Sequence, residues 1–171
     1  MKKMLVLYST VDGQTLKIIK AIEESIADKY HCEVMSLEEC QHLDMAIFDK
    51  VVIGGSVRYG HLNKKLYQFV AAHKEELEVK ENSFFCVNLT ARKAEKNTPE
   101  TNAYMQAFLE KSNWVPKQQA VFAGALLYSK YNWWQTLIIQ LIMKITGGST
   151  DTTKDIEFTD WAKVKSFAKT L

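Results

Sequence analysis

Short apolar runs alternate along this chain with longer segments in which apolar residues recur every three or four positions. The continuous runs are typical of strands covered on both faces, and the periodic segments are typical of amphipathic helices. The runs predict strands at residues 4–9, 32–37, 51–53, 83–89 and 120–127. The periodic segments predict helices at about residues 16–30, 62–77, 98–112 and 159–171. Strands that alternate with helices favour an α/β fold, in which a parallel sheet carries helices on both faces.

No repeat or linker divides the chain, so we predict a single domain over residues 1–171. Thr98, Pro99 and Glu100 predict the start of the third helix, as a cap, a first-turn proline and a favourable acid. Residues 128–158 depart from the alternation because they are too many for a simple crossover. We expect them to form an apolar, Trp-rich helical insertion after the fifth strand.

Composition narrows the possible classes of protein. The 171 residues suit one globular domain, and 47% hydrophobic residues are enough for a core, which excludes a disordered chain. The net charge of +2 does not indicate a nucleic-acid-binding protein, which would carry dense Lys and Arg on one face. The first apolar run is too short for an export signal, and no stretch reaches the roughly 18 uncharged apolar residues of a membrane-spanning helix.

Cysteine and histidine spacing gives no metal or disulfide motif. The three cysteines form no CxxC pair, and we expect them to be reduced thiols in the cytosol. None of the four histidines stands at ligand spacing from a cysteine or a group of carboxylates, so no metal site is predicted.

The loop after the first strand suits a phosphate. It combines hydroxyl and amide side chains with one glycine, directly before a helix: Ser9, Thr10, Val11, Asp12, Gly13, Gln14 and Thr15. It contains no Lys or Arg, so binding would rest on hydrogen bonds and on the helix dipole. The chain has neither GxxxxGK[ST] nor GxGxxG, which makes a mononucleotide the better fit. The same residues also suit a helix cap without a ligand, and the loop alone leaves both interpretations open.

Two further polar loops end strands that would lie on the same rim of a parallel sheet. They contain Ser56, Val57, Arg58, Tyr59, Gly60 and His61 in one, and Asn88, Leu89 and Thr90 in the other. The small residues allow the backbone to approach a flat ligand, and Tyr59 offers a ring for stacking. The agreement of three loops on one edge favours a ligand site there.

Residues 6–15 resemble the FMN-phosphate signature of the flavodoxin family. This resemblance implies a doubly wound, five-stranded parallel sheet in the order 2-1-3-4-5. It also implies FMN as cofactor, with its phosphate on the hydroxyls and amides of residues 10–15. The side chain of Asp12 would point away from that phosphate. The other two loops would then flank the isoalloxazine ring.

Nearly the whole chain resembles a family within this group, the oxygen-independent, menaquinone-dependent protoporphyrinogen IX dehydrogenases. The specific segments are residues 58–61, residues 88–93 and the Trp-rich insertion. The resemblance implies oxidation of protoporphyrinogen IX in haem biosynthesis, in three two-electron steps, with menaquinone or ubiquinone as acceptor. It also implies a peripheral membrane protein on the cytoplasmic face of the inner (cell) membrane.

The insertion has the composition of a helix that lies on a membrane. No acid occurs from residue 111 to 150, whereas four lysines do. An apolar helix with aromatics at one end and only positive charge suits an interface with anionic lipid. Thirteen residues from Trp133 span ~20 Å, too short to cross a bilayer. We expect six residues to contact membrane or quinone: Trp133, Trp134, Leu137, Ile138, Leu141 and Ile142. Packing of this helix on the domain itself, or on a second subunit in a homo-oligomer, is the alternative.

Basic residues near the rim suit the propionates of a porphyrinogen, since Arg binds carboxylates in a bidentate manner. The candidates are Arg58, Arg92, Lys93 and Lys96. A solvated charged loop at residues 92–96 is the alternative. His61 is a candidate for moving protons, and no catalytic base is assigned.

The competing function is that of a soluble, flavodoxin-type electron carrier. Such carriers are typically acidic near the flavin, whereas this chain is mildly basic. A receiver-type signalling domain would need clustered acids at the end of the first strand, which Tyr8, Ser9 and Thr10 do not supply.

Overall fold

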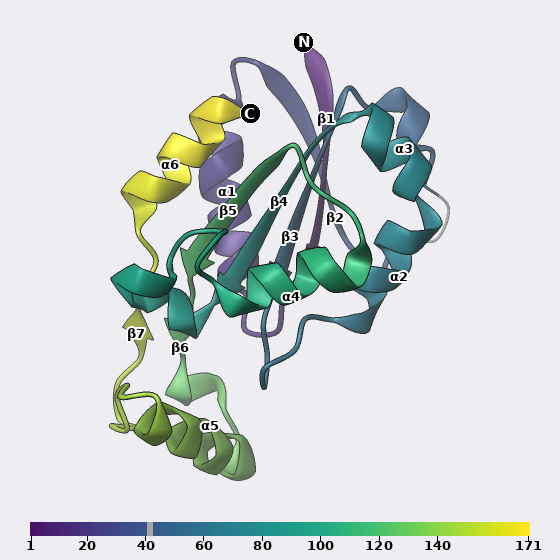
Figure 1. The fold of residues 1–171 in the computed structure, drawn as a ribbon. Coiled ribbons are helices and arrows are strands. Elements are labelled where there is room, and N and C mark those ends of the chain that lie inside the picture. Colours follow the sequence, from purple (N-terminus) through teal and green to yellow (C-terminus); the bar gives the residue numbers. More distant parts are fainter. Residues whose placement is uncertain (41–42) are drawn as a thin grey trace.

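Five parallel strands form the centre of the computed structural model, which describes residues 1–40 and 43–171 (Figure 1). They are β1 (Lys2–Ser9), β2 (Tyr30–Ser36), β3 (Lys50–Ser56), β4 (Glu81–Asn88) and β5 (Gln118–Ala123). Their order in the sheet is β2-β1-β3-β4-β5, and all four pairings are parallel. The predicted α/β, doubly wound sheet in the order 2-1-3-4-5 is thereby confirmed.

Helices cover both faces of the sheet (Figure 1). One face packs against α1 (Gln14–Ile26) and α6 (Trp161–Thr170), and the other against α2 (Lys64–Ala72), α3 (Lys74–Val79) and α4 (Ala103–Ser112). Side chains alternate along a strand, so Leu5 and Leu7 lie in one core and Met4 and Val6 in the other. This burial on both sides explains the continuous apolar runs of the strands.

Aromatic rings fill the core beneath α4. Phe84 of β4 stacks on Phe108 of α4 with ring centroids 4.1 Å apart, and Trp114 meets Phe108 edge-on at 6.2 Å. All three side chains are almost completely buried. These contacts pack α4 against β4, and Asn102, directly before the first turn of α4, lies beside Asn88 at the end of that strand.

Several predicted boundaries differ from the structure. The first helix ends at Ile26 rather than near Tyr30, where β2 begins, and the helix predicted at residues 62–77 is two helices, α2 and α3. The third helix begins at Ala103 rather than at Thr98, because the buried Asn102 side chain accepts the amide hydrogen of Met105 and so caps the helix. The preceding Thr98 forms a turn instead, in which Thr101 N donates to Thr98 O. The sheet strand predicted for residues 120–127 ends at Ala123.

The chain leaves the sheet at Gly124 and forms a separate two-stranded ribbon. β6 (Ala125–Leu126) pairs antiparallel with β7 (Ile156–Glu157), which returns from the insertion. Gly124 N donates to Asn88 O, and Gly124 O accepts from Phe158 N. These hydrogen bonds join the start of the ribbon to β4 and to the segment that follows β7. The predicted fifth strand was therefore two elements with different partners.

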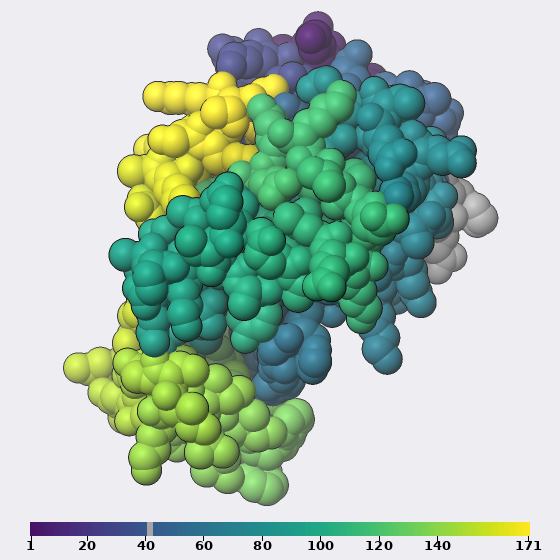
Figure 2. All heavy atoms as spheres, viewed as in Figure 1, coloured from purple at the N-terminus to yellow at the C-terminus, as the bar shows by residue number. Residues whose placement is uncertain are grey.

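The insertion forms a lobe at the carboxyl end of the sheet, seen in yellow-green in Figure 2. A turn at Tyr128–Lys130 leads to α5 (Trp133–Ile145), whose start is closed by a capping box between Asn132 and Gln135. The lobe has its own small core, formed by Leu126, Tyr128, Ile139 and Met143. In the ranges that the structure describes, no helix combines the length and apolar character needed to cross a membrane.

Candidate functional site

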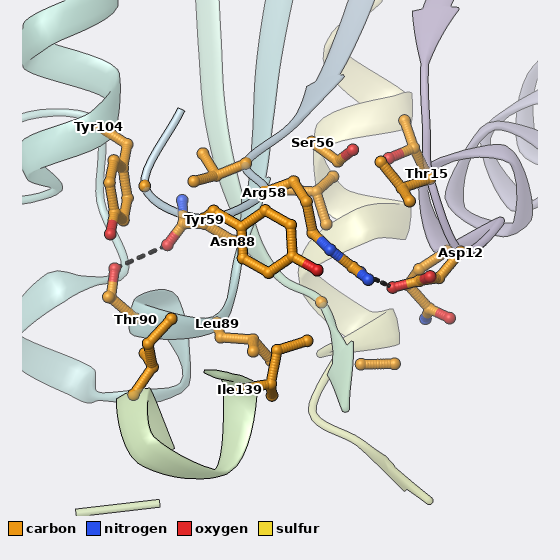
Figure 3. Close-up of a pocket in the computed structure, with 18 of the residues that line it drawn as sticks. Asp12, Thr15, Ser56, Arg58, Tyr59, Asn88, Leu89, Thr90, Tyr104 and Ile139 are labelled. Atoms are coloured by element: carbon orange, nitrogen blue, oxygen red, sulfur yellow. Dashed lines mark hydrogen bonds and ion pairs between the residues drawn. The ribbon is translucent and has the colours of Figure 1, made fainter. Parts of the chain in front are cut away.

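A cleft lies at the carboxyl ends of β1, β3 and β4, between the three rim loops and α5 (Figure 3). The loops predicted from sequence contribute Thr10, Val11, Asp12, Gln14, Thr15, Ser56, Val57, Arg58, Tyr59, Gly60, Asn88, Leu89 and Thr90 to its lining. Three predicted residues lie outside this lining: Ser9 is buried in β1, Gly13 is backbone at the start of α1, and His61 is exposed. The structure thus brings the three loops together.

The first loop turns into α1 through a left-handed glycine. Gly13 has φ +90°, a conformation that a side chain would strain, and its amide donates to the Thr10 hydroxyl at 3.1 Å. Directly after it, the Thr15 side chain is fully buried at the wall of the cleft. Its Oγ1 has no hydrogen-bond partner among the described residues. A buried hydroxyl without a partner is costly, so this atom favours a polar ligand in the cleft.

Gln14 lines the cleft, but its amide is used elsewhere. Its Nε2 donates to Thr159 Oγ1 at 2.9 Å and to Glu157 Oε2 at 3.1 Å. This side chain therefore ties the first loop to the return strand of the insertion.

An ion pair crosses from the second loop to the first. The Arg58 guanidinium donates to the Asp12 carboxylate, as Figure 3 shows, and both side chains are largely buried. The guanidinium also lies between two rings, 5.0 Å from the centroid of Tyr59 and 4.8 Å from that of Tyr131. Burial opposes its charge, but the Asp12 carboxylate and the two tyrosines more than offset this and raise the pKa of Arg58. Asp12 is thus turned toward Arg58.

The second loop is a tight hairpin. Arg58 and His61 exchange backbone hydrogen bonds of 2.8 and 3.0 Å, with Tyr59 at φ +50° and Gly60 at φ +80° between them. A tyrosine in the left-handed region is unusual, and the turn holds its ring beside Arg58. Val57 N donates to Val87 O and so joins this loop to β4.

The third loop rests on a buried network of amides. Asn88 Oδ1 accepts from Thr90 Oγ1 at 2.7 Å, from Ala91 N at 3.0 Å and from Asn102 Nδ2 at 3.1 Å. Asn102 Nδ2 also donates to Lys96 O at 2.8 Å. Because Asn102 caps α4 as well, one side chain positions both the helix and the loop.

Replacing Asn102 by alanine is expected to lower the free energy of unfolding by about 2–4 kcal/mol, since it removes a helix cap and leaves buried partners unpaired. Urea denaturation measures this loss. The exposed Gln106→Ala in the same helix is the matched control and should change stability by less than about 0.5 kcal/mol. A loss no larger than that of the control would contradict the role of the network.

The four basic residues predicted for carboxylates have different surroundings. Arg58 and Arg92 line the cleft, whereas Lys93 and Lys96 do not. Arg92 donates to Leu89 O at 2.8 Å and to Thr146 O at 3.1 Å, and so ties the third loop to the end of α5. Among residues 1–40 and 43–171, no three His, Cys, Asp or Glu side chains come close enough to hold a metal ion.

Known proteins are similar to this chain over most of its length. The model of the flavodoxin domain family matches residues 5–153. A "Protoporphyrinogen IX dehydrogenase [quinone]" from Leishmania major is 46% identical over 97% of this chain and 73% of its own length. The protein of that name from Escherichia coli K12 is 41% identical over 99% of this chain and 94% of its own length. The chain belongs to the protoporphyrinogen IX dehydrogenase family.

The fold is shared with a solved flavodoxin of low sequence identity. The two-electron reduced flavodoxin of Megasphaera elsdenii is 16% identical, with a TM-score of 0.54 over 69% of this chain and 84% of that one. A Lactobacillus acidophilus flavoprotein in complex with FMN is 19% identical, with a TM-score of 0.49 over 71% of this chain and 93% of that one.

The insertion of this protoporphyrinogen IX dehydrogenase family member presents an apolar face to solvent. Ile139 and Met143 of α5 point into the lobe. The six residues predicted for membrane or quinone contact are all exposed, with Trp133 at 77%: Trp133, Trp134, Leu137, Ile138, Leu141 and Ile142. The alternative of packing on the domain itself is thus right for Ile139 and Met143, whereas Trp133 and Trp134 are not part of the core of their own chain.

Sequence reasoning missed the cleft residues that come from other elements. They are Val87, Tyr104, Gly124, Ala125, Tyr131, Ile139, Met143 and Thr146. Ile142, predicted for the membrane, also lines the cleft at its edge. In this protoporphyrinogen IX dehydrogenase family member the insertion is thus one wall of the cleft. The capping residues Asn132 and Gln135 indicate in the sequence where α5 begins. No sequence pattern near them indicates which part of the domain the helix packs against.

Proposed function

We propose that the protein oxidises protoporphyrinogen IX to protoporphyrin IX and passes the electrons to a quinone, with FMN as cofactor, as a step of haem biosynthesis. The names of the two relatives supply the reaction. The observation that carries the proposal is the unpartnered Thr15 hydroxyl, buried at the start of α1 in a cleft lined by all three rim loops. A helix start with such a hydroxyl suits a phosphate.

The chain's own residues fit the cofactor. The hydroxyls of Thr10 and Thr15 and the first amides of α1 would hold the phosphate, and the loops at residues 56–60 and 88–90 would flank the ring. Bound there, FMN supplies the acceptor for hydride from the porphyrinogen and the donor of electrons to the quinone. Leu89, Ile139 and Ile142 form an apolar wall that keeps water from the ring.

The two cations that line the cleft suit an acidic substrate. Arg92, which has no ion-pair partner among the described residues, is the cation that we propose to face a propionate of the porphyrinogen. Arg58 is already paired with Asp12 and would offer the substrate only its remaining N–H donors, and Lys93 and Lys96 lie outside the cleft lining. His61 is exposed beside the second loop, where it has access to solvent protons. We assign no base to it, because it lies outside the cleft lining.

We propose that the exposed face of α5 rests on anionic lipid at the cytoplasmic face of the cell membrane. Its apolar residues would enter the interface while Lys144, in the last turn of α5, attracts anionic headgroups. The other side of the same helix lines the cleft, so a quinone dissolved in the bilayer, menaquinone or ubiquinone, would reach the cofactor without crossing water. An electron carrier has no need of such a face.

An anaerobic assay tests the reaction directly. Protoporphyrinogen IX and a menaquinone analogue are mixed with the protein, and porphyrin fluorescence is followed. Fluorescence that rises with both substrates present, and not without the quinone, is expected. Reduction and reoxidation of a bound flavin without porphyrin formation would instead indicate the soluble electron carrier.

Replacing Thr15 by valine is expected to weaken FMN binding by about tenfold to a hundredfold, through the loss of a hydrogen bond to a charged group worth ~1.5–3 kcal/mol. Without FMN the variant should be at least as stable as the parent, because valine buries no unpaired hydroxyl. Flavin fluorescence titration and thermal unfolding measure the two effects. Thr152→Val, at an exposed threonine outside the cleft, is the control. Unchanged FMN affinity for Thr15→Val would remove this loop from the site.

A further inference from the structure

The first loop contains no cation of its own and does contain an acid. A phosphate monoester carries nearly two negative charges near neutral pH, and a neighbouring carboxylate repels it. Asp12 stands in the middle of the loop that would hold the phosphate. The loop alone is therefore a poor site for a dianion, and the charge that offsets Asp12 must come from elsewhere in the chain.

Two cations from distant segments reach this loop. Arg58 pairs with the Asp12 carboxylate and neutralises it. Lys130, from the turn that opens the insertion, donates from Nζ to the Asp12 backbone oxygen at 2.8 Å. The same Nζ lies 3.9 Å from the place that a Cβ on Gly13 would occupy. The ammonium group thus stands beside the loop at the start of α1, just outside the residues that line the cleft, and can act on a phosphate there through its charge.

The ammonium group of Lys130 still has hydrogen-bond donors available for a ligand. An ammonium group has three donors, and one of them is used on Asp12 O. In the described part of the chain, no carboxylate lies within ion-pair distance of Lys130. Asp155 is near enough to interact with Lys130 through space but does not pair with it, so with Asp12 offset by Arg58 no ion pair neutralises the Lys130 charge at the site.

The turn that carries Lys130 is held in place. Ser129 N donates to Asp155 Oδ1 at 3.0 Å, which closes the insertion on itself. The Tyr131 ring covers the Arg58 guanidinium, and its hydroxyl accepts from Leu127 N at 3.2 Å. Lys130 therefore approaches the loop on a fixed turn.

We propose that the insertion completes the phosphate site of the first loop: Lys130 supplies its missing positive charge, and Tyr131 holds Arg58 against Asp12. The inference rests on the proposed binding of FMN and deepens it.

The test compares two flavins that differ only in the phosphate. Affinities of FMN and riboflavin are measured by fluorescence titration for the parent, for Lys130→Gln and for the control Lys154→Gln, an exposed lysine of the same insertion. Lys130→Gln is expected to weaken FMN about fivefold at low salt and to leave riboflavin unchanged. High salt should shrink the difference, since it screens exposed charges. Lys154→Gln should bind both flavins as the parent does.

Three results would overturn the inference. One is unchanged FMN affinity in Lys130→Gln, and another is an equal loss for FMN and riboflavin, which would mean a change of shape rather than of charge. The third is an equal loss of FMN affinity in Lys154→Gln, which would mean a general effect of net charge. A parent protein that binds neither flavin would instead overturn the proposed function itself.

Discussion

Replacing Leu137 and Leu141 together by serine is expected to abolish most of the affinity of the protein for vesicles of anionic phospholipid. The two side chains are 57% and 59% exposed and lie one turn apart on α5. Each leucine that enters an apolar environment contributes ~1.5–3 kcal/mol, so the pair should reduce vesicle binding at least about a hundredfold. Sedimentation with vesicles measures the change.

Val115 is 76% exposed outside the insertion, and Val115→Ser should leave vesicle binding unchanged. Both leucines are exposed, so the double variant should retain the stability of the parent. Vesicle binding equal to that of the parent would contradict the lipid contact. Loss of a dimer in analytical ultracentrifugation would assign the face to a second copy of the chain instead.

Replacing Phe108 by alanine is expected to lower the free energy of unfolding by ~3–5 kcal/mol, the usual cost of removing a fully buried aromatic ring. The ring stacks on Phe84 and meets Trp114 edge-on, so the cavity would open at the centre of one core. Chemical denaturation measures the loss. The exposed Val79→Ala should change stability by less than about 0.5 kcal/mol. A loss below about 1 kcal/mol for Phe108→Ala would contradict the packing described.

The fold was predictable because strand and helix periods are local properties. Buried parallel strands leave continuous apolar runs, and the order of the runs and periodic segments points to one class of fold. The start of α4 was not predictable, since Thr98 and Asn102 are both good capping residues. The burial of Asn102 against Asn88 decides between them, and that contact depends on the folded chain.

Some parts of the candidate site were likewise predictable from the sequence, and others were not. Its loops were predictable because the carboxyl ends of neighbouring parallel strands meet at one edge. Tyr131 and Lys130 were not, since their place beside the first loop follows from the ribbon that carries the insertion back over the cleft. The Asp12 side chain was expected to point away from the phosphate. In the structure it pairs with Arg58, a partner that the sequence did not indicate.

The antiparallel pairing of β6 and β7 separates the length of the insertion from the architecture of the main sheet. Paired strands lie about 5 Å apart, so the chain enters and leaves the insertion at nearly the same point. The strand order of the main sheet is then independent of how many residues lie between them.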